Sequence, residues 1–240
     1  MKATPPISSA RLWIGLAPAM VLPCLASLVY FVWLPGGAIA QAIYGATKVF
    51  TLAWPLACFW WWRRRGAERP RFLAKEDRSR HLKSLPLGAA TGIGIGAFIL
   101  MFAASPLGAG LLAEAGPKIG AKVDALGIRD AYWLFAAFLA VAHSGIEEYF
   151  WRWFVFGNLR RLLPAAGSLA LAAAAFASHH VVVLAQFFPL AWAFALGAGV
   201  GIGGALWSWM YARQNSLAGA WLSHMLIDVA ILWIGWLAIR

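Results

Sequence analysis

Nine ionisable side chains lie inside otherwise apolar stretches of this 240-residue sequence. They are Lys48, His143, Glu147, Glu148, Arg152, His179, His180, His224 and Asp228. A charge at the centre of a membrane helix opposes insertion by about 2.5–3.5 kcal/mol, and such residues usually face a functional site. All of them except Lys48 follow residue 140. The sequence therefore predicts one polar site, built by the last hundred or so residues.

The spacing of these residues indicates which of them can meet. Residues four apart lie on one face of a helix, so Glu148 and Arg152 can form an ion pair that neutralises both. Glu147 points about 100° away and has only His143, one turn earlier, as a local partner. A carboxylate without a cation partner in a low-dielectric site is suited to act as a general base. Glu147 is therefore the prime candidate for catalysis.

Chain lengths predict which groups stand at the same depth. Glu147 lies 17 residues before Pro164 and His180 lies 16 residues after it. Apolar segments joined at that turn run antiparallel, so both groups stand about 25 Å from it. His224 and Asp228 share a face of the last apolar segment. They reach the same level only if the long segment before Pro164 extends beyond the bilayer.

The composition identifies the elements that must position this site. Hydrophobic residues make up 62% of the chain and charged residues 12%, against about 25% charged in soluble domains. This excludes a soluble or disordered chain and predicts an all-α, polytopic transmembrane helical bundle of about seven spans, forming a single membrane domain over residues 1–240. The predicted spans are 12–34, 39–62, 86–107, 131–160, 165–187, 189–211 and 216–239. Breaks are predicted at Pro35-Gly36-Gly37, Pro86, Pro106, Pro164, Pro189 and the polar segment 213–216.

Two glycine series are typical of close helix packing. Gly88, Gly92 and Gly96 recur every four residues, as do Gly197 and Gly201. Small residues at this spacing let membrane helices approach closely, and neither series follows a strand as a dinucleotide-binding motif would.

The net charge of +11 is best explained by membrane topology. Basic residues concentrate in the loop 63–84, at Arg160-Arg161 and at Arg213, which all fall on one side if the N-terminus is cytoplasmic. The loop predicted over 108–130 falls on the other side. We therefore expect an integral membrane protein in contact with the lipid bilayer and no nucleic-acid partner, and the Ala-, Gly- and Arg-rich composition favours a bacterial inner (plasma) membrane.

Three short motifs carry a family resemblance. Residues 147–152 read EEYFWR and match EExxxR, residues 176–180 read FASHH and match FxxxH, and residues 224–228 read HMLID and match HxxxN/D. In this order, each on an apolar segment, they resemble the type II CAAX prenyl endopeptidases and their bacterial relatives, the CPBP (Abi) group of glutamate-dependent intramembrane proteases. The resemblance covers about 131–239, the predicted catalytic core.

The resemblance implies an endopeptidase that cleaves near the C-terminus of a membrane-attached protein or peptide substrate, either CAAX-like or a C-terminal sorting tail. It implies no cofactor and no metal. Glu147 would activate water, His180 would help hold that water, and His224 with Asp228 would stabilise the oxyanion. Glu148 and Arg152 would form the supporting ion pair.

Several residues are left with more than one interpretation. The family often has Asn where this chain has Asp228, so Asp228 is either a protonated donor or an ionised group that orients His224. His143, His179 and Phe176 are further candidates for the site, although packing roles fit them as well. Trp151 and its aromatic neighbours are interpreted as lipid-facing or interfacial, and Lys48 has no assigned partner.

Two other classes of function remain open. Glu147, His179, His180, His224 and Asp228 are all metal-ligand types, so a metal-dependent membrane enzyme or transporter is an alternative. The HExxH spacing that places two histidines on one helical face is missing, which counts against it. The third class is a non-catalytic membrane protein with an immunity or scaffolding role.

Overall fold

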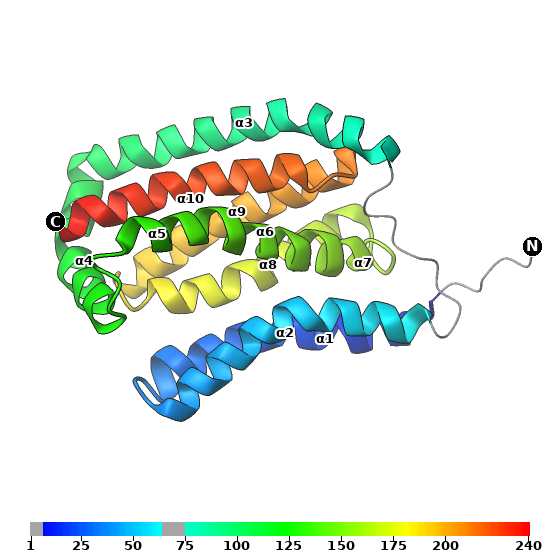
Figure 1. Cartoon of the computed structure of the whole chain (residues 1–240), viewed down its shortest axis with the longest axis horizontal. Helices are drawn as coiled ribbons and strands as arrows, with labels where there is room; N and C mark the ends of the chain where they lie inside the picture. The colour runs from blue at the N-terminus through cyan, green and yellow to red at the C-terminus, as the bar shows by residue number, and fades with distance from the viewer. Residues whose placement is uncertain (1–6, 64–74) are drawn as a thin grey trace, which may run out of the picture.

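Long helices run back and forth along one axis of the protein (Figure 1). The computed structural model describes residues 7–63 and 75–240. The α-helices are α1 (Ser9–Leu28), α2 (Ala38–Arg63), α3 (Lys75–Ala104), α4 (Pro106–Ala125), α5 (Tyr132–Ala137), α6 (Ser144–Glu147), α7 (Gly157–Leu159), α8 (Ala165–Leu184), α9 (Leu190–Gln214) and α10 (Ala218–Ile239). Wider π-helical turns form η1 (Val29–Trp33), η2 (Phe138–His143) and η3 (Glu148–Phe156).

The predicted all-α polytopic bundle is confirmed. Six helices are long and apolar enough to cross a membrane, and they correspond to six of the seven predicted spans. These six are Ser9–Trp33, Ala38–Trp62, Arg78–Ala104, Ala165–Leu184, Leu190–Gln214 and Ala218–Ile239. The remaining predicted span, 131–160, is helical from Tyr132 to Leu159 but is divided into short α- and π-helical units, α5 to α7. It therefore contributes the interrupted helix of the bundle.

The prediction of a loop over 108–130 is wrong for most of its length, because α4 occupies Pro106–Ala125. The side chain of Ser105 accepts a hydrogen bond from the Gly108 amide, and Pro106 occupies the first turn, where its missing N–H has no cost. Glycines and an internal Pro117 hid this helix in the sequence, since both residue types disfavour helices. Packing of α4 against α3 and α10 outweighs that low propensity.

The predicted break at Pro86 is also wrong. Helix α3 begins at Lys75, inside the basic loop predicted over 63–84, and continues through Pro86 to Ala104. Packing along α10 supports the helix on both sides of this proline: the Ser84 hydroxyl lies 3.1 Å from the Ser216 hydroxyl, and Gly88 is in backbone contact with Gly219. The basic residues of segment 64–74, including Arg64 and Arg65, lie outside the described residues.

The glycine series do pack helices closely, as the sequence predicts. Along α3, Gly88, Gly92 and Gly96 lie successively against α10, and a Cβ added at Gly92 would stand 2.9 Å from Ser223 Cα. On α9, a Cβ at Gly201 would stand 3.3 Å from Ala177 Cβ of α8. These two close pairs, α3–α10 and α8–α9, hold the helices that carry the third and second motifs.

The first and last helices place the two ends of the described chain at opposite ends of the bundle, as an odd number of passes along it requires. Helix α1 begins at the end of the bundle where α2 finishes, and α10 finishes at the opposite end (Figure 1). Between these ends, the helix α5–α7 lies beside α10 and near α8 (Figure 1). The three motif-bearing segments are therefore neighbours inside the bundle.

Candidate active site

Glu147 occupies the point where the α6 turn gives way to the wide turns of η3. Its side chain is 11% exposed, whereas that of Glu148 is 1% exposed. Carboxylate oxygen Oε1 lies 3.9 Å from His143 Nε2 and 3.8 Å from His179 Nε2, and Oε2 lies 3.6 Å from His224 Nε2. These separations exceed direct hydrogen-bond range. The carboxylate is therefore surrounded by imidazoles while its oxygens stay available to a reactant.

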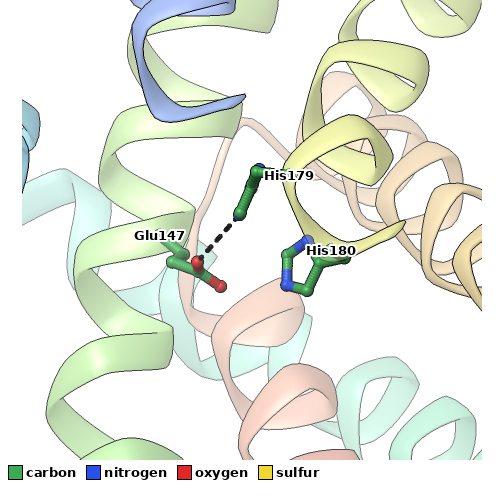
Figure 2. A group of neighbouring side chains, drawn as sticks. All are labelled: Glu147, His179 and His180. Atoms are coloured by element: carbon green, nitrogen blue, oxygen red, sulfur yellow. Dashed lines mark ion pairs between the residues drawn. The ribbon is translucent and has the colours of Figure 1, made fainter. Parts of the chain in front are cut away.

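The second motif delivers two imidazoles to this carboxylate from α8. Figure 2 shows His179 and His180 on the α8 ribbon, both facing Glu147. One ligand atom from each of the three side chains lies within 4.8 Å of the others. His180 Nδ1 stands 2.9 Å from the Phe176 carbonyl, one turn earlier. An Nδ1–H donated to that carbonyl leaves Nε2 as an acceptor inside the site.

Glu148 joins the first and third motifs. Its oxygen Oε1 lies 3.0 Å from Arg152 Nη1 and 2.8 Å from His224 Nδ1. The predicted ion pair with Arg152 is confirmed, while the bond to His224 was not foreseen. Because Glu148 holds the Nδ1 edge of His224, the Nε2 edge points toward Glu147 and Asp228.

Arg152 is buried between a carboxylate and two aromatic faces. Its guanidinium carbon lies 4.3 Å from the centre of the Phe176 ring and 4.8 Å from that of Trp207. A Cβ at Gly204 of α9 would stand 2.9 Å from the Phe176 ring and 3.1 Å from Arg152 Nη2, so glycine makes room for this arrangement. The two rings and the carboxylate are the groups that stabilise the buried cation.

Two tryptophans belong to the site although the sequence did not place them there. Trp207 stacks on the His224 ring at 4.0 Å and 16°, and its Nε1–H donates to the Ser223 hydroxyl at 3.1 Å. Trp151 is 4% exposed and stacks on His179 at 5.6 Å and 9°, so its interpretation as a lipid-facing aromatic is wrong. The sequence does not identify Trp207 as a site residue, because no ionisable side chain lies near it on α9.

Asp228 and Lys48 stand at the edges of the cluster. Asp228 Oδ1 lies 3.7 Å from His224 Nε2, and its side chain is 23% exposed. Glu148 occupies the position behind His224 that an orienting Asp228 would need. Lys48 Nζ lies 3.1 Å from His143 Nε2, so its partner is an imidazole. All of the predicted site residues thus gather in one region, with Phe176 as a packing wall.

These features define a polytopic α-helical membrane protein with a buried carboxylate–imidazole site. Residues 129–230 match the family model for type II CAAX prenyl endopeptidase Rce1-like proteins. The relation predicted from the three motifs is confirmed over this stretch, and at the family level it supports a CAAX-type membrane protease. Helices α1 to α4 lie outside the match. Comparison with curated proteins finds no match, and comparison with solved structures finds none.

Proposed function

We propose that this protein is an intramembrane endopeptidase in which Glu147 activates a water molecule to cleave membrane-attached substrates near their C-terminus. The observation that carries the proposal is the Glu147 carboxylate, which has three imidazole Nε2 atoms at 3.6–3.9 Å. The family match over 129–230 supports the protease class. We assign the catalytic core to residues 131–239.

In the proposed reaction, water attacks the carbonyl carbon of the scissile peptide bond. Glu147 accepts one proton from this water as the C–O bond forms, and later passes it to the departing amine when the C–N bond breaks. His180 Nε2 accepts the second hydrogen bond from the water, because its Nδ1–H is engaged by the Phe176 carbonyl. Water is consumed and no other reactant is needed.

His224 is the proposed donor to the oxyanion. Its Nδ1–H donates to Glu148 at 2.8 Å, so a proton on Nε2 would point into the site. Glu148, itself held by Arg152 at 3.0 Å, stabilises that imidazolium. A protonated Asp228 would supply a second donor. Removing one such donor commonly raises the barrier by about 3–4 kcal/mol.

The substrate and setting follow from the same proposal. The site lies within a bundle of membrane-spanning length, so the substrate is a protein or peptide attached to the lipid bilayer, with a CAAX-like end or a C-terminal sorting tail. The excess of Lys and Arg at one end of the bundle supports a cytoplasmic N-terminus in a bacterial inner membrane.

The decisive test is cleavage of prenylated and unprenylated C-terminal tail peptides by the full chain in liposomes. We expect Glu147→Gln to lower cleavage by about 10²–10⁴-fold or more, because the amide has the same shape but cannot take a proton. The matched control is Glu114→Gln on α4, which removes an exposed carboxylate outside the three motifs. Wild-type rates in Glu147→Gln would refute the general-base role, and no cleavage by the wild type would favour a non-catalytic role.

A metal-dependent hydrolase is a second candidate, because Glu147, His179 and His180 have ligand spacing. One observation weighs against it. The buried Nδ1 of His179 has no hydrogen-bond partner among the described residues, whereas metal-bound histidines usually donate their other N–H. Loss of cleavage on chelation, with rescue by zinc, would select this second candidate.

A further inference from the structure

Lys48 is a cation in an unfavourable position that the proposed mechanism does not use. It lies on the exposed surface of α2, about 15 Å from the nearer end of the span Ala38–Trp62. That depth is greater than a lysine side chain can snorkel across. Among the side chains that the structure describes, Lys48 forms no ion pair with an acid. A charge held at this depth without an acidic partner usually marks a binding function.

The ammonium stands close to the reacting carboxylate. The Lys48 Nζ lies 3.1 Å from His143 Nε2. His143 Nε2 in turn lies 3.9 Å from Glu147 Oε1. Because both distances end on one atom, Nζ is at most about 7 Å from the carboxylate. One turn further along α2, the Tyr149 hydroxyl donates to the Leu52 carbonyl at 3.2 Å. Helix α2 is therefore anchored to η3, which carries Tyr149, one turn from Lys48.

Two of the three ammonium donors remain for a ligand. A protonated lysine has three N–H donors and no acceptor, and His143 accepts one of them. The Tyr44 ring lies 5.1 Å from Nζ and adds a cation–π contact, which needs no hydrogen bond. The other N–H groups thus require an anion or water, and a carboxylate satisfies them with charge-assisted hydrogen bonds.

We propose that Lys48 binds the C-terminal carboxylate of the peptide substrate. This rests on the proposed endopeptidase function and specifies its substrate: a chain with a free C-terminus only a few residues beyond the scissile bond. The distance between the scissile bond and the substrate carboxylate is limited by three lengths: the distance from Glu147 to Nζ, the width of the attacking water and the hydrogen bond to Lys48. Together they allow about 15 Å, which an extended peptide covers with about four residues at most. Binding of this carboxylate supplies the ion pair that Lys48 lacks.

The test is a binding measurement with full-length Glu147→Gln protein in nanodiscs, so that peptides are not consumed. The probes are two fluorescent prenylated tail peptides that are identical except for a terminal carboxylate or a terminal carboxamide. We expect the carboxylate form to bind about tenfold more tightly, with this preference lost in Lys48→Met and kept in Lys48→Arg. Lys122→Met is the matched control, since Lys122 also lies beside a tyrosine, 3.1 Å from the Tyr30 hydroxyl.

Three outcomes overturn the proposal: equal affinity for both peptides, a preference that persists in Lys48→Met, or no binding of either peptide. Cleavage is measured separately, which distinguishes this proposal from the endopeptidase function. Wild-type protein that cleaves both peptides with equal kcat/KM overturns the role of Lys48 and leaves that of Glu147. Carboxylate-dependent binding without cleavage supports Lys48 and overturns the endopeptidase function.

Discussion

Glu147 and Glu148 are adjacent in the sequence but lie in two different kinds of surroundings. Glu148, Arg152 and His224 form a supporting network with contacts of 2.8 and 3.0 Å. Glu147, His143, His179 and His180 form a looser reactive cluster, in which the contacts of the carboxylate with His143 and His179 are 3.9 and 3.8 Å. His224 belongs to the first through Nδ1 and reaches the second through Nε2. Short contacts fix the geometry of Glu148, whereas the longer ones leave the oxygens of Glu147 without a direct hydrogen bond to these imidazoles.

The largest difference is expected from substituting the two glutamates in turn. Glu148→Gln leaves Arg152 buried without its carboxylate, which typically destabilises by about 3–5 kcal/mol, so the yield and the unfolding temperature should fall. Glu147→Gln should change the unfolding temperature little, because no close ion pair depends on it. Thermal unfolding of both variants in the same detergent measures the contrast. If both variants unfolded at equally lowered temperatures, the proposed difference between the supporting network of Glu148 and the looser cluster of Glu147 would be contradicted.

An intermediate effect is expected at Asp228, which borders the reactive cluster without a close contact. If it is a protonated donor to the oxyanion, Asp228→Asn keeps a donor of similar size and should retain activity within about tenfold. Ionisation at higher pH would then silence the wild type but not the variant. Comparison of their pH–rate profiles measures this. A loss of a hundredfold or more at every pH would show that the charge of Asp228 is required instead.

The smallest effect on stability is expected from the exposed ion pair between Arg129 and Asp124, which can be compared with the buried pair of Glu148 and Arg152. Arg129 follows α4, and its Nε lies 2.5 Å from Oδ1 of Asp124 in the last turn of that helix. The hydrogen bond from Arg129 lowers the pKa of Asp124. A carboxyl with a lowered pKa contributes stability above its unfolded-state pKa and loses it as the pH falls through the folded-state pKa. Asp124→Asn should therefore change the unfolding temperature slightly at neutral pH and not at all in strong acid. If Asp124→Asn lowered the unfolding temperature as much as Glu148→Gln does, burial would not explain why the Glu148–Arg152 pair matters more for stability.

Local spacing predicted part of the site correctly. The i, i+4 relation predicted the Glu148–Arg152 pair, and equal distances from Pro164 brought Glu147 and His180 together. Both inferences need only one helix or two helices joined by a short turn. The hydrogen bond between Glu148 and His224 joins residues 76 positions apart and depends on how α10 is rotated against the helix α5–α7. Nothing in one sequence fixes that rotation.

The helices whose position follows from a long apolar segment could be predicted from the sequence. The features that depend on contacts between helices could not. Six predicted spans are present as long apolar helices, because an apolar run of about 20 residues with few charges has few alternatives to a membrane span. Helix α4 was missed since its glycines and Pro117 argue for a loop, and contact with α10 overrides them. Trp151 was misplaced for a related reason: the wide π turns of η3 direct it onto His179.

The position of His224 on α10 has a consequence for biosynthesis. A chain is made from its N-terminus, so Glu148 and Arg152 enter the membrane before α10 does. Their pairing within one helix lets both charges be neutralised at that stage without help from later segments. The imidazole that links Glu148 to the reactive cluster arrives with the last described helix. The site is therefore completed only when α10 has been inserted, after the Glu148–Arg152 pair can already have formed within its own helix.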